Sequence, residues 1–454
     1  MQRHSFAKFG ILAVVGALLP AACGASDTAD EATAGTPTSA GTPTSAGTPT
    51  SAGTPTSAGA DPTDTAEAAP GTGAPAPTRS ASQPFAVDQI ESSPRNVVHS
   101  GIQVWRSQIV PSDLPEPLID LGEIRSGGPP PDGIPPVDQP RFLDPGTVDF
   151  LADNEPVLAL EIDGDARAYP VQILTWHEIV NDTVGGVPVG VTYCPLCNSA
   201  LAYDRRVTID GSEEVLDFGT SGLLLNSSLV MYDRQTETLW SHFTGQAIVG
   251  QLTGTELRDY AVSTVAWSVW RDANPGGLVL STETGYDRSY GRNPYPGYDS
   301  VDGVPFLFEG DVDGRYTALT RILGIESDGE AIGIPMLDLQ DAGVLAGELD
   351  GRTFVAWWTE GTSSALDAAD IADGYDVGAT GVFVAEAAGA MLTFAPAGSG
   401  LFIDDQTGSS WNVLGRAVSG ELEGRQLEAL PHVDTFWFAW STFHTDTRLI
   451  TGTR

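Results

Sequence analysis

The 454-residue chain carries 60 acidic and 22 basic residues, a formal charge of -38, and 41% of its residues are hydrophobic. So acidic a surface repels nucleic-acid phosphates and anionic lipid headgroups, and we therefore expect no nucleic-acid partner. About 370 residues follow the low-complexity N-terminal part, which is enough for two domains or for one large domain with an ample core.

Residues 1–22 have the three parts of an export signal: basic residues, an apolar stretch, and two alanines directly before Cys23. The stretch is too short to span a bilayer, and a cysteine after small residues is where a lipoprotein signal is cut. We predict an extracytoplasmic protein of the cell envelope that meets the membrane only through a lipid on Cys23. Pro20 occupies a place where such signals usually carry leucine, so ordinary secretion is the alternative.

Two segments of unusual composition follow the predicted signal. Residues 23–84 include four copies of Gly-Thr-Pro-Thr-Ser-Ala and read as a disordered tether, because they cannot bury enough apolar surface to offset chain entropy. Residues 85–154 alternate short apolar stretches with proline clusters, which exclude central strands and long helices. We expect this second segment to wrap the surface of the next domain.

Regular structure is predicted from Pro156 onward. Residues 157–162 and 166–171 flank an Asp-Gly-Asp turn and predict a hairpin, and residues 173–181 place apolar side chains on one face of a short helix. A strand that carries two cysteines comes next. We interpret Glu178 and Asp182 as solvated, since carboxylates are abundant throughout the chain.

The chain then repeats itself. Residues 233–236 and Trp240 return as residues 404–407 and Trp411, 171 positions later, and several glycines and tryptophans downstream recur at nearly the same offset. Self-similarity at a fixed offset indicates duplicated structural units. We predict a mainly β (β-rich α+β) fold with two tandem, divergent copies of one β unit and short helices: residues 155–285, residues 318–454, and an aromatic and proline-rich connection over residues 286–317.

Cys194 and Cys197 are two of only three cysteines, and they frame a Cys-Pro-Leu-Cys tetrapeptide at the end of an apolar strand. Two thiols at this spacing can close a small disulfide or bind one soft metal ion. A disulfide across so short a loop constrains the unfolded chain little, which argues against a purely stabilising role. A glutaredoxin-like site would place a helix after the motif, whereas strand-like sequence follows Cys197.

Two hypotheses for this site combine the cysteines with histidines. In the first, Cys194 and Cys197 cycle between dithiol and disulfide, and His177 or His242 assists proton transfer in an oxidoreductase whose protein or small-molecule partner is unidentified. In the second, the same cysteines together with His177 and His242 offer two sulfur and two nitrogen ligands to copper or zinc. A non-catalytic binding or structural module with a local disulfide is the third hypothesis. The sequence does not decide whether the protein is an enzyme.

The second copy lacks all four of these residues. On the overlay of the copies the matching positions hold Trp358 for Cys194, Gly361 for Cys197, Val413 for His242 and residues 340–342 for His177. A shared scaffold retains what packing and turns demand, so residues present in one copy only are better candidates for chemistry than for folding.

Several long motifs resemble those of a bacterial and archaeal family of exported proteins, the domain of unknown function numbered 3179. The resemblance runs from about Asp132 to the C-terminus and rests on residues 166–170, 176–182, 192–199, 219–222, 231–234 and 291–296. The family brings no established activity. The resemblance implies thiol redox chemistry, because the family includes selenoproteins and selenium would replace a sulfur at Cys194 or Cys197.

Overall fold

The computed structural model describes residues 100–327 and 329–452. The predicted export signal, Cys23 and the predicted tether lie outside these residues. Strands dominate the described part and the helices are short, which confirms the predicted mainly β class. No helix among the described residues is long and apolar enough to cross a membrane.

The described part of the proline-rich segment contributes short elements: α1 (Gly101–Ser107), β1 (Ile124–Ser126), β2 (Phe142–Leu143) and two 3-10 turns, Leu121–Glu123 and Pro145–Thr147. Strands β1 and β2 each occupy the edge of a sheet. Edges tolerate nearby prolines, because one side of an edge strand needs no hydrogen-bond donors.

Residues 155–285, the predicted first unit, form one hairpin, β8-β9, and three larger sheets, β15-β3-β4-β16-β2, β14-β7-β6-β5 and β1-β10-β11-β12-β13, to which the proline-rich segment adds the edge strands β1 and β2. The elements of this unit are β3 (Pro156–Ile162), β4 (Asp165–Pro170), α2 (Val171–His177), β5 (Ile179–Val184), β6 (Val187–Cys194), β7 (Ser199–Asp204), β8 (Arg206–Ile209), β9 (Ser212–Val215), β10 (Phe218–Leu225), β11 (Ser228–Asp233), β12 (Leu239–Ser241), β13 (Ala247–Val249), β14 (Asp259–Tyr260), β15 (Ser263–Ala266), α3 (Trp267–Ala273) and β16 (Leu278–Leu280).

The first hairpin and helix differ from the prediction mainly in where the helix ends. Strands β3 and β4 pair around Asp163 and Gly164, whose positive φ angles of 50° and 79° suit a two-residue hairpin. Helix α2 starts at Val171 and ends at His177, four residues before the predicted end. The predicted end was wrong because Glu178 adopts φ 60°, which stops the helix, and the following β-branched residues join β5.

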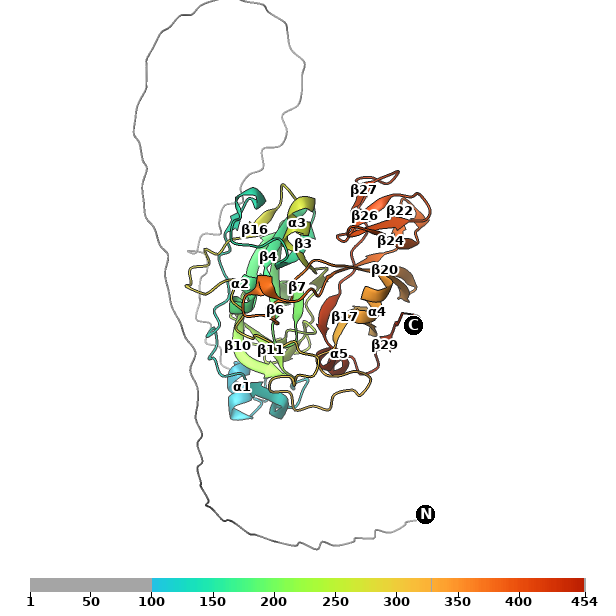
Figure 1. Ribbon diagram of the computed structural model, residues 1–454. Helices are drawn as coiled ribbons and strands as arrows, with labels where there is room; N and C mark the ends of the chain where they lie inside the picture. Colours follow the sequence, from blue (N-terminus) through green and yellow to red (C-terminus); the bar gives the residue numbers. More distant parts are fainter. Residues whose placement is uncertain (1–99, 328, 453–454) are drawn as a thin grey trace, which may run out of the picture. The chain divides into compact units, whose positions relative to one another are not determined.

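The second unit runs through a similar series of elements, followed by colour from orange to red in Figure 1. They are β17 (Arg321–Ser327), β18 (Glu330–Pro335), α4 (Met336–Ala342), β19 (Val344–Leu349), β20 (Arg352–Thr359), a 3-10 turn at Ile371–Asp373, β21 (Ala379–Val384), β22 (Glu386–Ala387), β23 (Ala390–Met391), β24 (Phe394–Gly398), β25 (Leu401–Asp404), β26 (Ser410–Asn412), β27 (Ala417–Ser419), β28 (Val433–Phe436), α5 (Trp437–Phe443) and β29 (Arg448–Leu449).

Sheet order and one side-chain contact are alike in the two units. The order β15-β3-β4-β16 is matched by β28-β17-β18-β29, and the last pair is parallel in both. The indole of Trp240 donates to Asp233 at 2.9 Å, and the indole of Trp411 donates to Asp404 at 2.9 Å. These likenesses agree with the predicted duplication, which stays a prediction.

The register of the overlay needs a correction of one residue at the cysteine strand. Ile179 faces Thr192 across the β5–β6 pair, and Val344 faces Trp357 across the β19–β20 pair. Cys194, at the end of β6, therefore corresponds to Thr359 rather than Trp358. After this strand the two units differ, because a tight turn joins β6 to β7 whereas residues 360–378 lie between β20 and β21.

One core cluster contains residues of both units. It includes both cysteines and Trp240 from the first unit and Phe436 to Trp440 from the second. The Cys-Pro-Leu-Cys turn is therefore buried by side chains from the second unit, although that unit supplies none of the predicted ligands.

Candidate metal centre

The Cys-Pro-Leu-Cys turn joins β6 directly to β7. Cys194 faces Ser199 across the strand pair, and Asn198 takes φ 50°, a conformation that asparagine tolerates better than most residues. The carbonyl of Cys197 accepts hydrogen bonds from the Thr435 hydroxyl at 2.7 Å and the Phe436 N–H at 3.2 Å. Strand β28 thus fixes the turn from the side of the second unit.

Cys194, Cys197 and His242 form the one His/Cys/Asp/Glu cluster with metal-ligand spacing in residues 100–327 and 329–452. One ligand atom from each lies within 4.8 Å of the others, and the three residues are 1%, 0% and 0% exposed. Atoms that share one ion through bonds of about 2.0 to 2.3 Å lie roughly 3.3 to 4.6 Å apart, so a small contraction would suffice for binding.

His242 follows β12 and reaches the sulfurs through its imidazole. Its Nδ1 lies 3.5 Å from Ser199 Oγ, and the same Oγ lies 2.9 Å from Cys197 Sγ. Its Nε2 is fully buried and has no hydrogen-bond partner. A buried ring nitrogen without a hydrogen-bond partner is costly, and it marks His242 as an imidazole that the surrounding protein leaves unsatisfied.

Burial and hydrogen bonds shift the three pKa values in different directions. Burial, followed by the neighbouring Cys197, raises the pKa of Cys194 well above its ordinary value. Burial also acts on Cys197, but hydrogen bonds with Cys194, Ser199 and Ser228 outweigh it and lower the pKa of that thiol. Burial lowers the pKa of His242 to about 4, which keeps the imidazole neutral, the form that binds metals.

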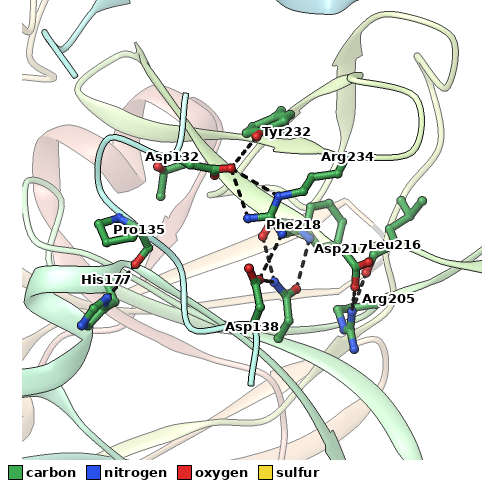
Figure 2. A network of polar contacts seen from close by, with 12 residues as sticks. Asp132, Pro135, Asp138, His177, Arg205, Leu216, Asp217, Phe218, Tyr232 and Arg234 are labelled. Carbon is green, nitrogen blue, oxygen red and sulfur yellow. Dashed lines mark hydrogen bonds and ion pairs between the residues drawn. The ribbon is translucent and has the colours of Figure 1, made fainter. Parts of the chain in front are cut away.

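His177 lies outside this cluster. Its Nδ1 is 2.6 Å from the Pro135 carbonyl, and its Nε2 is 2.6 Å from the Tyr290 hydroxyl (Figure 2 shows the contact with Pro135). A carbonyl only accepts, so Nδ1 carries the hydrogen, Nε2 accepts from Tyr290, and Thr284 donates to the Tyr290 oxygen at 2.6 Å. With both nitrogens engaged, His177 ties the proline-rich segment and the connection to α2.

The proline-rich segment is also held by Arg234. Figure 2 shows its guanidinium between Asp132 and Asp138, at 3.2 Å and 3.0 Å. Together with the His177 contact, these ion pairs fix residues 132–138 against α2 and the strands beside it.

Glu178 is buried and Asp182 is half-buried with its side chain 9% exposed, so their interpretation as solvated residues was wrong. Glu178 is 8% exposed, and burial, with a smaller contribution from Cys194, raises its pKa to about 8. Asp182 accepts from the Tyr169 hydroxyl at 2.7 Å and lies 3.9 Å from Arg167. Glu178 therefore lies close enough to Cys194 for the two groups to influence each other's ionisation.

Tyr298 is a neighbour of the site that the sequence did not single out. Its hydroxyl donates to the Leu196 carbonyl, inside the Cys-Pro-Leu-Cys turn, at 2.9 Å. Burial raises its pKa to about 12, so this donor keeps its proton at neutral pH. An aromatic, proline-rich run is typical of a connection, and nothing in it marks one tyrosine as the contact.

Comparison with known proteins places residues 131–447 in one family model, whose description is "Protein of unknown function (DUF3179)". Searches of the curated proteins and of the solved structures found no match.

Proposed function

The chain belongs to the DUF3179 family, whose description names no activity, and from the geometry of its buried site we propose that it binds one copper(I) ion through Cys194, Cys197 and His242. The observation that carries the proposal is the cluster itself: two thiols and an imidazole meet at 0–1% exposure, and Nε2 of His242 has no other partner. Such soft and borderline ligands select copper(I) or zinc.

Copper(I) suits the three donors better than zinc does. Closed structural zinc sites use four protein ligands, and catalytic zinc sites keep a fourth position open to water. The cluster offers three donors among the described residues, and all three are buried away from solvent. If Cys23 carries a lipid, the protein would hold the ion at the cell envelope, outside the cytoplasm.

A competition titration with a coloured copper(I) chelator tests the proposal. We expect the wild-type chain to take up one ion and the His242→Gln variant to lose most of its affinity. His432→Gln is the matched control, because His432 is also buried, with Nδ1 2.8 Å from the Leu430 carbonyl, but lies outside the cluster. Wild-type protein that binds no copper, or a His242→Gln variant that binds as tightly, would contradict the proposal.

The copper affinity is expected to rise with pH through the neutral range. Copper binds thiolates, and the raised pKa of Cys194 means that a proton must leave when the ion enters. Each displaced proton changes the affinity by about tenfold per pH unit. His242, with a pKa of about 4, adds no competition above about pH 5. Chelator titrations at pH 6, 7 and 8 would measure the slope, and a flat profile would mean that the thiols are not ligands.

Replacing Ser199 with alanine is expected to weaken copper binding by about 10-fold to 100-fold, the usual effect of losing a group that orients a ligand. The Ser199 hydroxyl lies 2.9 Å from Cys197 Sγ and 3.5 Å from His242 Nδ1, so it is placed to orient both proposed ligands. Ser199→Thr keeps the hydroxyl and should restore most of the affinity. Equal affinities for wild type and both variants would exclude this role.

A thiol redox pair is the second candidate, favoured by the unequal thiols. Cys197 Sγ lies 2.9 Å from the Ser199 hydroxyl and 3.6 Å from the Ser228 hydroxyl, contacts that stabilise a thiolate and favour Cys197 as the attacking cysteine and Cys194 as the resolving one. The pair would pass two electrons and two protons to a partner disulfide, which becomes a dithiol. Redox titration of the metal-free protein tests it: a reversible couple at about -120 to -270 mV supports exchange, and one below about -300 mV indicates a structural disulfide.

A further inference from the structure

Exposed apolar side chains concentrate in one loop of the connection between the units. Of the thirteen large hydrophobic side chains that are exposed in the described residues, four lie within Val301–Leu307, and Val304 is 81% exposed. Contiguous exposed apolar surface, as opposed to scattered single residues, usually marks an interaction site.

This loop is held in place on both sides of the exposed residues. Pro305 is buried within it, the Gly303 N–H donates to the Ser300 carbonyl at 2.7 Å, and Phe308 packs against Phe438 with ring centroids 5.1 Å apart. A loop anchored in this way presents its apolar side chains to solvent as a fixed surface.

The loop is linked to the candidate metal centre by one side chain. The Phe306 N–H donates to the Tyr298 hydroxyl oxygen at 3.1 Å, and that hydroxyl donates to the Leu196 carbonyl at 2.9 Å. The sulfurs of Cys194 and Cys197 are buried, so another protein can exchange an ion with them only if the Cys-Pro-Leu-Cys turn or the residues that pack over it move. A partner bound to the loop would touch the element that holds the turn closed.

Charge favours one class of occupant. Asp302 and Asp311 are exposed beside the apolar residues, Glu309 is exposed there but paired with Arg125 at 2.5 Å, and the whole chain carries a formal charge of -38. A second copy of this chain and an anionic lipid surface would both be repelled, whereas a cationic protein would be attracted.

We propose that Val301–Leu307 is the docking surface for a positively charged protein that delivers copper(I) to, or withdraws it from, the buried site. The identity of the transferred ion rests on the proposed copper function. The position of the docking surface rests only on the exposed loop Val301–Leu307. The ion passes from the partner's ligands to Cys194, Cys197 and His242 without a change in its oxidation state, and the displaced thiol protons go to solvent.

Site-specific photo-crosslinking in the cells that produce the protein tests the surface. A Val304→p-benzoylphenylalanine variant should crosslink to a protein with net positive charge and with cysteine, methionine or histidine copper ligands. The control is Val418→p-benzoylphenylalanine, at a valine of β27 that is 42% exposed. A crosslink to a second copy, to lipid or to residues 1–99 of the same chain, the same product from both positions, or no product would each overturn the docking proposal.

Transfer kinetics with that purified partner complete the test. We expect the copper-loaded partner to load a Val304→Lys, Phe306→Lys variant about tenfold more slowly than wild type, because the variant loses apolar contact and repels a cationic protein, and we expect the difference to shrink at high salt. A small-molecule copper(I) complex should load both chains equally. Equal rates from the partner would overturn the docking surface. Failure of the wild type to load from the small complex would instead overturn the copper function, while the crosslinks still decide the docking.

Discussion

Replacing Cys197 with serine is expected to reduce bound copper from one ion per chain to none. The oxygen of serine is a hard donor that stays protonated at neutral pH, so the cluster would keep only one sulfur and one nitrogen for a soft ion. Cys197 is fully buried, and its sulfur has a hydroxyl 2.9 Å away at Ser199, so a serine side chain fits the polar surroundings. Metal analysis after loading and desalting would measure the loss.

A second readout separates lost binding from lost folding. A ligand that binds only the folded chain stabilises it by about 2.7 kcal/mol at a free concentration of 100 times Kd. Copper(I) should therefore raise the melting temperature of the wild type and leave that of Cys197→Ser unchanged, while the two metal-free proteins melt at similar temperatures. Met336→Leu, which alters another buried sulfur outside the cluster, should behave like wild type.

Comparing Cys197→Ser with Cys194→Ser distinguishes the two proposed functions. A metal site needs both thiols as ligands, so both variants should lose copper equally. A redox pair predicts unequal variants, because the cysteine with the lowered pKa attacks and the other resolves the mixed disulfide. A Cys194→Ser variant that traps a mixed disulfide with a partner, and binds no less copper than wild type, would favour redox exchange.

The hairpin β3–β4 shows what the sequence could predict about the fold. The hairpin could be predicted because its signal is local: two runs of strand-forming residues flank Asp163 and Gly164. The turn needs positive φ angles, and Asp and Gly adopt these readily. The end of α2 had no such local signal, because Glu178 adopts φ 60° where most carboxylate side chains would continue a helix. Its counterpart in the second unit is Gly343, at φ 69°, the residue type that the position would ordinarily require.

The site was predictable in its cysteines and only partly in its histidines. Cys194 and Cys197 are neighbours along one turn, so their proximity follows from spacing alone. His177 and His242 were equivalent in the sequence, and long-range packing decides between them: the hairpin partner of β11 carries His242 to the sulfurs. At the end of α2, the ring of His177 contacts the Pro135 carbonyl at 2.6 Å instead of the sulfurs. The spacing of apolar residues along the sequence predicts strands and helices, but it does not predict which histidine contacts the cysteines in the folded chain.

Replacing Arg321 with leucine is expected to lower the free energy of unfolding by about 3 to 5 kcal/mol, the usual effect of removing one partner from a buried ion pair. Arg321 starts β17, and its guanidinium lies 3.3 Å from Asp299 and 3.5 Å from Asp434, in surroundings where all three side chains are at most 11% exposed. Without the arginine, two buried carboxylates face each other's charge with no cation between them.

The matched control is Arg352→Leu, at the start of β20 in the same unit. Arg352 pairs with Glu428 at 2.6 Å, but the two side chains are 47% and 61% exposed, so solvent screens the pair and its loss should cost about 0 to 1 kcal/mol. Denaturant unfolding of both variants and wild type measures the difference. Adding Asp299→Asn and Asp434→Asn to Arg321→Leu should recover part of the lost stability, since the uncompensated charges disappear.

The ion pair between Arg321 and Asp434 is connected to the candidate metal centre by a hydrogen bond. Asp434 accepts from the Asn198 side chain at 3.4 Å, and Asn198 follows Cys197 in the turn with φ 50°. If Arg321 positions Asp434 for this contact, Arg321→Leu should also weaken copper binding under conditions where the variant is fully folded, and Arg352→Leu should not. A variant that is destabilised but binds copper with unchanged affinity would show that the second unit buries the turn without adjusting its geometry.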